Sequence, residues 1–337
     1  QSRSSAASDV YKRQQWLVPG DLLNPEKLLL DIEPAKEREK NLKGASGTVV
    51  RCSANNASEK PFLPYNLSEA QIECANKFGF SPEKTLSLLQ ALYDTHHLVS
   101  YPRTSCRYLP TGELENLQAT LDSLKAMDPS ISETIDGLDT SLRSDAWDDS
   151  KVGAHYGLIP TSHRGDLTQL TGDELKAYTL IRDSFIIQFM PPAEYRKVSL
   201  EIHSSEGNDI FMAKGSTLTN PGWLEYLRPA KDEDAGENED SQEIPELPAG
   251  TEVIFDSLTI LKQKTKPPRY YTDATLIAIM TNCSSLVKDI DMKRVLKNTC
   301  GIGTDATRAA IIKTLFDRNY VVKKGKQIRI CLLYTSD

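Results

Sequence analysis

Residues 100–105 read Ser-Tyr-Pro-Arg-Thr-Ser, and this stretch is the most informative part of the chain. Proline disfavours the α region for the residue before it, so Tyr101 is expected in extended backbone. Residues i and i+2 of an extended segment share a face, which puts Arg103 beside Tyr101. A tyrosine with a pKa of about 10 is a weak nucleophile, and a guanidinium can stabilise charge on phosphate oxygens. Taken alone, the stretch fits either attack by Tyr101 on a phosphate or a structural strand tyrosine beside a surface arginine.

Length and composition set the class of protein. The chain has 337 residues, 39% of them hydrophobic and 26% charged, which suits a soluble protein of two or three domains. No apolar run approaches the roughly 20 residues that a membrane-spanning helix needs, and the N-terminus lacks the pattern of a signal peptide. We therefore expect a cytoplasmic protein with no membrane partner.

Cysteine and histidine positions argue against a metal site or a disulfide framework. The six cysteines are scattered and form no C-x-x-C pair, so reduced thiols are expected. The adjacent His96 and His97 lack the spacing of a helical metal-binding pair. Asp31 and Glu33 stand two residues apart in a polar stretch and are expected to be surface acids. The sequence predicts no metal ligands in this chain.

The net charge of −7 arises from one segment. Residues 231–246 contain eight acidic residues and one basic residue, and the remainder of the chain has 39 of each. Such a run is usually a surface loop or a disordered insert. The total charge therefore does not argue against a nucleic-acid partner, because local clustering of charge decides binding.

Both ends of the chain are unusual. Residues 1–14 and 331–337 resemble translated adapter sequence at the ends of a fragmentary reading frame, and we expect them to lie outside the fold. A naturally flexible terminus is the alternative. In either case the gene is expected to extend beyond both ends.

Hydrophobic periodicity and capping residues predict the secondary structure. Ser81 and Pro82 mark the start of a helix that ends near His96. Residues 47–52 are predicted as a strand, 68–78 and 172–189 as amphipathic helices, 112–148 as polar helix, 196–261 as a β-rich unit, 272–281 and 304–317 as helices, and 320–326 as a hairpin. The last helix with its basic hairpin suggests a winged-helix-like module.

Five ordered stretches resemble type IA DNA topoisomerases. Residues 101–110, Tyr-Pro-Arg-Thr-Ser-Cys-Arg-Tyr-Leu-Pro, are similar to the active-site signature of that family. Residues 63–67, 153–161, 267–276 and 301–307 are similar to further family motifs and follow in the same order. The topoisomerase III branch fits best, on residues 105–110 and on Pro-Gly-Trp-Leu-Glu at 221–225.

The resemblance implies a role for each candidate residue. Tyr101 would form a 5'-phosphotyrosyl bond with a single DNA strand. His155 would hydrogen-bond the scissile phosphate or assist proton movement, and Arg103 would neutralise charge in the transition state. Thr307 and Arg318 match positions that contact DNA. Without the resemblance these last two would be a helix-face hydroxyl and a cation favoured by the helix dipole, and His155 a structural histidine.

The family motif differs from this sequence at one position. Gly157 stands where the family usually has alanine. Since glycine is conformationally permissive, the resemblance predicts a slightly more flexible loop there.

The resemblance also implies a fold, a multidomain α+β fragment of a toroidal enzyme. Residues 15–66 and 196–266 would form a β-rich arch with the acidic loop 231–246, residues 67–195 an inserted helical domain with the catalytic tyrosine, and 267–330 part of a winged-helix-like DNA-binding base. Magnesium is expected in the complete enzyme, held by a Toprim domain before this chain. The isolated chain should then bind DNA weakly without cleaving it.

ATP is not expected as a cofactor. Gly301-Ile302-Gly303 lacks the third glycine of a dinucleotide-binding loop, and no Walker A string occurs. The phosphotyrosyl bond would conserve the energy of the cleaved linkage. Single-stranded DNA is the expected partner, and the resemblance also suggests a helicase as a protein partner.

Two other functions fit part of the sequence. A non-catalytic DNA-binding module built on the winged-helix-like end would leave Tyr101 structural. A tyrosine recombinase would use the same nucleophile, but it needs arginines and histidines upstream of a late tyrosine, whereas Tyr101 precedes His155.

Overall fold

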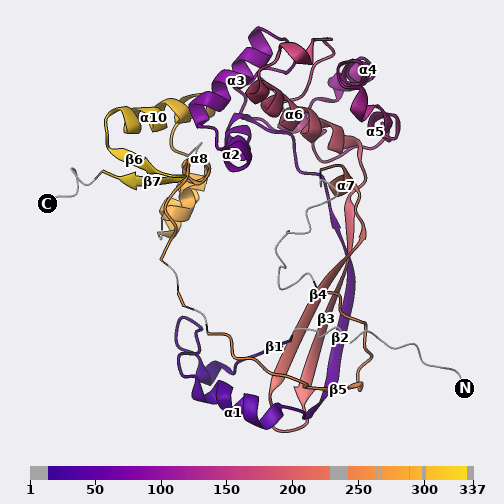
Figure 1. Ribbon diagram of the computed structural model, residues 1–337, viewed down its shortest axis with the longest axis vertical. Coiled ribbons are helices and arrows are strands. Elements are labelled where there is room, and N and C mark those ends of the chain that lie inside the picture. Colours follow the sequence, from indigo (N-terminus) through magenta and orange to yellow (C-terminus); the bar gives the residue numbers. More distant parts are fainter. Residues whose placement is uncertain are drawn as a thin grey trace, which may run out of the picture. The chain divides into compact units, whose positions relative to one another are not determined.

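The computed structural model describes residues 14–227, 242–262, 264–265, 267–287, 289–297 and 301–331 (Figure 1). They form two compact units, within residues 1–59 and 192–266 and within residues 60–191 and 267–337. The units divide at 59/60 and 191/192, a few residues from the predicted domain boundaries. The predicted helical domain and base segment lie together in the second unit. The termini expected to be extraneous fall outside the described residues, apart from Gln14 and Cys331.

The first unit is built on an antiparallel sheet of five strands in the order β1-β4-β3-β2-β5. The strands are β1 (Gln15–Trp16), β2 (Ser46–Glu59), β3 (Ala193–Ser204), β4 (Ile210–Asn220) and β5 (Glu252–Ile254). Strands β2 and β3 pair along almost their whole length, from Gly47↔Ser204 to Glu59↔Ala193. The unit also contains η1 (Gly20–Leu22), α1 (Glu33–Leu42) and α7 (Trp223–Leu227). The predicted β-rich segment is confirmed by β3, β4 and β5.

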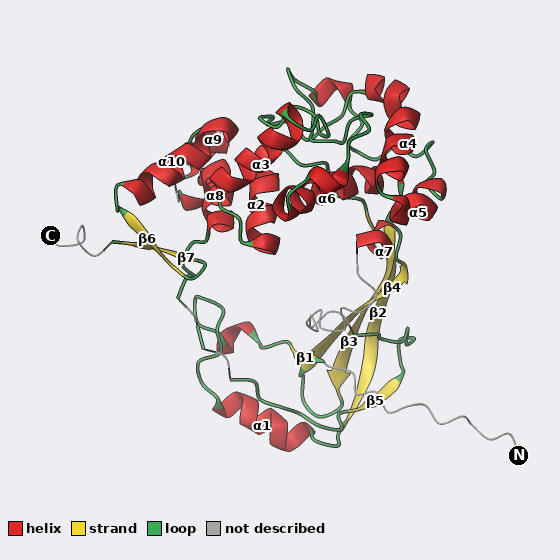
Figure 2. Cartoon of the chain, turned by 45° about the horizontal axis from the view of Figure 1, so that its top comes forward, coloured by secondary structure: helices red, strands yellow, loops and turns green. Residues whose placement is uncertain are grey.

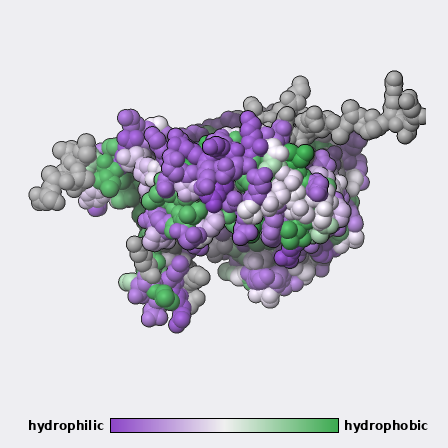
Figure 3. Space-filling view, turned by 90° about the horizontal axis from the view of Figure 1, so that it is seen from below, coloured by the Kyte–Doolittle hydropathy of each residue, from purple (hydrophilic) through white to green (hydrophobic). Residues whose placement is uncertain are grey.

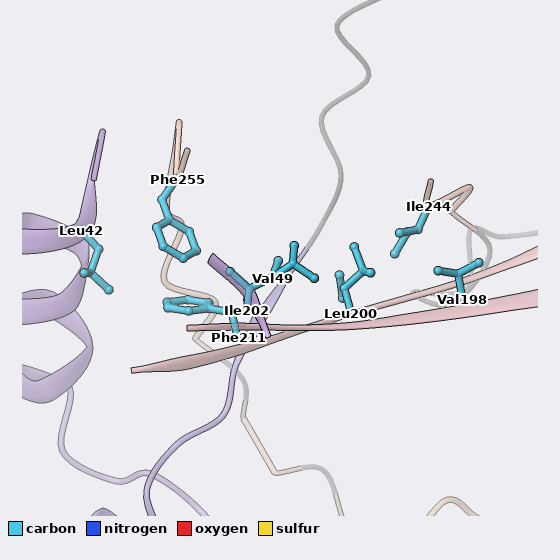
Figure 4. Close-up of a cluster of buried hydrophobic side chains, with 9 residues drawn as sticks. Leu42, Val49, Val198, Leu200, Ile202, Phe211, Ile244 and Phe255 are labelled. Carbon is cyan, nitrogen blue, oxygen red and sulfur yellow. The ribbon is translucent and has the colours of Figure 1, made fainter. Parts of the chain in front are cut away.

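The core of this unit lies on one face of the sheet (Figure 4). Alternating residues of β3, namely Val198, Leu200 and Ile202, point to that face because successive strand side chains alternate. Phe211 of β4 packs on Phe255 with ring centroids 4.6 Å apart. Leu42 of α1 and Val49 of β2 complete the buried set with Ala213 and Ile244.

Part of the predicted acidic loop packs against this sheet. Residues 231–241 lie outside the described residues, but Gln242 and Ile244 lie beside β4. The backbone of Ser216 donates a hydrogen bond to the Gln242 carbonyl at 3.2 Å, and Ile244 is only 6% exposed. The apolar side chain of Ile244 therefore belongs to the core, although its neighbours in sequence are acidic.

The second unit is mostly helical (Figure 2). Its elements up to residue 191 are α2 (Leu67–Phe78), α3 (Pro82–Asp94), η2 (Thr111–Asn116), α4 (Leu117–Met127), η3 (Pro129–Ile131), α5 (Ser132–Asp136), η4 (Asp149–Lys151), η5 (Leu167–Gln169), α6 (Gly172–Ile186) and η6 (Ile187–Phe189). Ser81 caps α3 as predicted, accepting a hydrogen bond from the Lys84 backbone at 3.2 Å. Thr171 and Glu174 form a capping box at the start of α6.

The prediction of helix throughout residues 112–148 is wrong after Asp136. Aspartates followed two residues later by serine form local turns instead, because the carboxylate accepts hydrogen bonds from the next residues. Asp139 binds the backbone and hydroxyl of Ser141, and Asp148 binds those of Ser150. These side-chain bonds replace the helical backbone pattern.

The C-terminal part of the second unit packs on α2 and α3. It comprises α8 (Asp273–Thr281), η7 (Cys283–Leu286), α9 (Ile290–Lys297), α10 (Asp305–Asp317), β6 (Val321–Lys324) and β7 (Gln327–Ile330). Ile277 and Met280 of α8 form a cluster with Ile312 of α10, and Ile72 of α2 packs against it. The predicted helices and hairpin are confirmed.

The surface view agrees with the composition. The face shown in Figure 3 is mainly hydrophilic, with small hydrophobic patches between the polar groups. Within the described parts of the chain, no helix is both long enough and apolar enough to span a bilayer.

Candidate active site

The Tyr101 segment is held in place by a neighbouring stretch of chain. Ser100 donates its backbone N–H to the Ile159 carbonyl at 2.9 Å, and Thr161 donates to the Leu98 carbonyl at 3.1 Å. The Ser100 hydroxyl donates to the Gly157 carbonyl and accepts from the Ile159 N–H, both at 3.1 Å. Val99 and Pro160 form an antiparallel bridge. Tyr101, for which extended backbone is predicted, directly follows this short two-stranded contact.

This contact places His155 against the tyrosine. The two rings lie 4.4 Å apart between centroids and are tilted by 34°. On α3, Tyr93 meets the Tyr101 ring edge-on at 5.6 Å. Tyr101 is half-buried and His155 exposed. Among the described residues the Tyr101 hydroxyl has no hydrogen-bond partner, so it is free to meet a substrate.

Arg103 lies two residues further on and is exposed. Its Nε donates a hydrogen bond to Oε1 of Gln90 at 3.3 Å. Gln90 in turn donates from Nε2 to Asp94 at 2.6 Å. The terminal guanidinium nitrogens of Arg103 have no partner within the described residues, which leaves the fork available for an anion.

An open depression of about 500 Å³ lies beside these residues. Arg103, Arg107, Lys151 and His155 contribute to its lining, with Tyr108 among the remainder. Arg107 donates to the carbonyls of Leu63 and Pro64 at 2.7 and 2.9 Å, so it fixes the local backbone. A hydrogen bond from Lys151 to Asp148 raises the pKa of this lysine. The depression is therefore suited to an anionic ligand.

Two other tyrosines of this unit, Tyr65 and Tyr156, are poorly suited to ionise. Burial raises the pKa of Tyr65 well above its ordinary value of 10. Burial, with Glu113 nearby, raises the pKa of Tyr156 to about 12. Both shifts disfavour the phenolate, because the charged form loses hydration in a low-dielectric surrounding. Tyr65 and Tyr156 are thus poor candidates for a nucleophile.

Gly157, where the resemblance predicts a slightly more flexible loop, is closely packed. It is buried, its N–H donates to the Tyr108 carbonyl at 3.0 Å, and its own carbonyl accepts from Ser100. A Cβ at this position would lie 3.2 Å from the carbonyl carbon of Arg107 and from Pro64 Cβ. The tight packing accounts for a glycine here.

The structure leaves Thr307 and Arg318 apart from the Tyr101 group. Within the described residues, neither has a hydrogen bond, ion pair or ring contact with Tyr101, Arg103 or His155. Thr307 belongs to the cap of α10, where its hydroxyl accepts from the Thr304 N–H at 2.8 Å. Arg318 is the exposed C-cap residue of the same helix.

Comparisons with known proteins agree with this geometry. The sequence model of the family described as "DNA topoisomerase" matches residues 22–332. The chain belongs to the DNA topoisomerase family.

Curated relatives identify the branch of this family. DNA topoisomerase 3 of Salmonella typhimurium is 38% identical over 85% of this chain and 43% of its own length. The enzyme of that name from Vibrio cholerae is 37% identical over 84% of this chain and 43% of its own length. DNA topoisomerase 3 of Bacillus subtilis is 34% identical over 86% of this chain and 40% of its own length. The chain is thus topoisomerase III-like, of type IA, and spans less than half the length of these relatives.

A solved structure is similar in fold. Full-length topoisomerase I from Thermotoga maritima superposes with a TM-score of 0.63 at 22% identity, covering 91% of this chain and 46% of that one. The predicted α+β class is confirmed at this level.

Sequence reasoning missed a buried ion pair that joins the motifs of this topoisomerase chain. Arg308 of α10 is 1% exposed, and its Nη1 donates to Ser68 of α2 at 2.9 Å and to Asp305 at 2.8 Å. Ser68 also donates to Asp305. Arg308 further binds the carbonyls of Ile302 and Gly303 at 3.2 and 3.1 Å. The available signal was Arg308 itself, a charged residue in the first turn of α10 whose burial hydrophobic periodicity does not reveal.

Sequence reasoning also missed Ser100 and Gln90, the residues that hold the Tyr101 segment and Arg103. Gln90 lies three residues before Tyr93 on α3, so helical spacing puts both on the face toward the site. Ser100 carried no sequence signal beyond its place before the tyrosine.

Proposed function

We propose that this chain carries the nucleophile of a type IA DNA topoisomerase, and that Tyr101 bonds covalently to the 5' phosphate of one DNA strand. The observation that carries the proposal is the half-buried Tyr101 ring packed against His155, which lines a basic depression together with Arg103. This arrangement supports a nucleophile with an unbonded hydroxyl, an imidazole against its ring and an arginine two residues further along the chain.

The reaction is a transesterification. The Tyr101 hydroxyl oxygen forms a bond to phosphorus, and the bond from phosphorus to the 3' oxygen breaks. The phenolic proton leaves Tyr101 and a proton is taken up by the released 3' oxygen. The phosphodiester is exchanged for a phosphotyrosyl ester of similar energy, so the reverse attack by the 3' hydroxyl reseals the strand without ATP.

Two side chains assist in this proposal. The free end of Arg103 offers paired N–H donors to the phosphate oxygens, where negative charge increases in the transition state. His155, exposed and against the Tyr101 ring, is placed to hydrogen-bond the phosphate or to move a proton. Gln90 keeps Arg103 on the α3 side of the depression.

Magnesium does not fit the residues that the structure describes. Within those residues no group of three or more His, Cys, Asp or Glu side chains could hold a metal ion. Asp31 and Glu33 are exposed, and Asp31 accepts a hydrogen bond from the Glu33 backbone at 3.0 Å. No step of the reaction proposed here passes through a metal.

The same proposal includes the substrate, the DNA contacts, the cellular compartment, the partner and the domain roles that the family resemblance implies. The substrate is single-stranded DNA, Thr307 and Arg318 contact it, and the reaction takes place in the cytoplasm, with a helicase as a partner. The first unit has the role of the arch, residues 67–195 that of the tyrosine domain, and residues 267–330 that of a winged-helix-like base. The three helices and the hairpin of that last segment support its assignment.

The test is covalent capture of DNA by the complete gene product. Incubation with magnesium and a labelled single strand, stopped with detergent, should give a labelled protein that Tyr101→Phe abolishes. Tyr108→Phe, in the same depression, is the matched control and should retain the adduct. An adduct that persists in Tyr101→Phe would refute the assignment. Binding without any adduct in the wild type would favour the non-catalytic DNA-binding module.

A further inference from the structure

The C-terminal segment of the second unit has a strong excess of positive charge. Residues 267–331 contain twelve lysines and arginines, five aspartates and no glutamate. Four of the aspartates are paired within the segment, as Asp273–Lys323, Asp291–Arg294, Asp305–Arg308 and Asp317–Lys313. The fifth, Asp289, accepts a hydrogen bond from the Met292 backbone at the start of α9. The segment therefore keeps cations that no carboxylate of its own neutralises.

Three of the cations without a carboxylate partner lie on the β6–β7 hairpin. Lys324, Lys326 and Arg329 have no carboxylate partner within the part of the chain that the structure describes. Lys324 and Lys326 are exposed, one on each side of the tight turn at Gly325. Like charges this close persist only where water or an anionic ligand screens them.

The two faces of the hairpin differ in character. On one face, Ile328 is 7% exposed and Lys323 reaches Asp273 at 2.6 Å. Strand periodicity directs the alternate residues to the opposite face, where Val322 pairs with Arg329 and Lys324 with Gln327. On this outer face Val322 is 43% exposed.

An aromatic side chain extends the outer face. The Tyr271 carbonyl accepts a hydrogen bond from the Ile328 N–H at 2.7 Å, so residues 270–271 run beside β7. Tyr270 is 55% exposed, and the Arg329 guanidinium lies over its ring, 4.3 Å from the centroid. The Nε of Arg329 has no hydrogen-bond partner. A stacked tyrosine and guanidinium offers a flat surface of the kind on which an unpaired base can stack.

We propose that Tyr270 and Arg329, with Lys324 and Lys326, form a binding surface for single-stranded DNA, the lysines contacting phosphates and the stacked pair a base. We name these four residues the hairpin platform. The choice of DNA rests on the proposed function, whereas the preference for a single strand rests on the exposed stacking surface, because bases in a duplex are already stacked.

Binding to this chain tests the proposal directly. A labelled oligo(dT) is titrated against the 337-residue chain, with fluorescence anisotropy measured at several salt concentrations. Tyr270→Ala should weaken binding by about fivefold or more, the loss expected for one stacked base, and leave the salt dependence unchanged. The double variant Lys324→Ala, Lys326→Ala should weaken binding and reduce the salt slope, by about 0.7 for each phosphate that a lysine no longer neutralises.

Lys313→Ala is the matched control, since it removes an exposed lysine that is paired with Asp317 on α10. Circular dichroism confirms that each variant is folded. Any of three results would overturn the hairpin platform. Tyr270→Ala could keep the wild-type affinity, or Lys313→Ala could lose as much affinity as the platform variants. A duplex of the same length could also bind more tightly than oligo(dT). The assay requires no strand cleavage. If the 337-residue chain binds oligo(dT) as expected but the complete gene product forms no adduct, only the proposed function is contradicted.

Discussion

At the scale of single residues, the site depends on the contact between residues 98–100 and residues 157–161. Ser100 bonds to both Gly157 and Ile159, and this places the following residue, Tyr101, against His155. Arg103 is then directed by Gln90. Each group is ordinary by itself. Their combination places the Tyr101 ring against His155, which lines a depression together with Arg103.

The geometry of the Arg103 side chain is expected to matter more than its charge. Lysine keeps the positive charge but lacks the planar fork that binds two phosphate oxygens together. In the complete gene product, Arg103→Lys should slow single-turnover DNA cleavage by about tenfold, and Arg103→Ala by about a hundredfold or more. Equal rates for Arg103→Lys and the wild type would show that a point charge is sufficient there.

At the scale of elements, α10 is joined to α2 by hydrogen bonds between Ser68 and the Arg308–Asp305 ion pair. Arg308 is almost fully buried, and its partners Ser68 and Asp305 come from both helices. It also binds the backbone of the Gly301–Gly303 turn. Gly301 has φ of +76°, and a Cβ there would lie 2.1 Å from the Met280 carbonyl oxygen. The fold therefore requires both glycine at position 301 and arginine at position 308 for structural reasons.

Removing the Arg308 side chain should destabilise the second unit. Arg308→Met leaves the Asp305 carboxylate without its cation, and breaking a buried pair costs about 3–5 kcal/mol. Arg318→Met, on the exposed end of the same helix, should change the free energy of unfolding by less than about 0.5 kcal/mol. Urea unfolding followed by circular dichroism measures both. Similar losses in the two variants would argue against the special role of Arg308.

The sequence predicted most elements because their signals are local. Ser81 with Pro82 marked the start of α3, and alternating apolar residues marked β3. Residues 137–148 were predicted wrongly, because competition between aspartate side chains and the helical backbone is not visible in hydrophobic periodicity. Burial of Ile244 within an acidic segment was also missed, since only packing against β4 reveals it.

The candidate site was predictable only in part. Tyr101 and Arg103 are neighbours in sequence, but His155 was assigned from a family motif, and its contact with Tyr101 depends on the pairing of residues 98–100 with 159–161. Gln90 binds Arg103 on another segment, and Arg308 reaches Ser68 on another helix. No local pattern could have named those partners.

At the scale of the whole molecule, acid should destabilise the fold through its turns. Hydrogen bonds from Ser141, Ser150 and Thr168 lower the pKa of Asp139, Asp148 and Asp166 from the ordinary value of 3.8. A carboxyl with a lower pKa in the folded state contributes stability above its unfolded pKa. That contribution is lost as the pH falls through the folded pKa.

The free energy of unfolding should therefore decrease steeply below about pH 4. Replacing all three aspartates with asparagine, which can still accept the turn hydrogen bonds, should make that decrease shallower. Urea midpoints measured between about pH 7 and pH 3 provide the comparison. A triple variant as acid-sensitive as the wild type would mean that other carboxyls are responsible.

The measurement that tests the central claim most directly is the identity of the residue that carries the DNA. The adduct formed by the complete gene product is digested with nuclease and trypsin, and the peptide bearing a nucleotide is sequenced by mass spectrometry. Trypsin releases residues 85–103, which contain both Tyr93 and Tyr101 and so include an internal control. Our account predicts the nucleotide on Tyr101, whereas a nucleotide on Tyr93 or on any other peptide would contradict it.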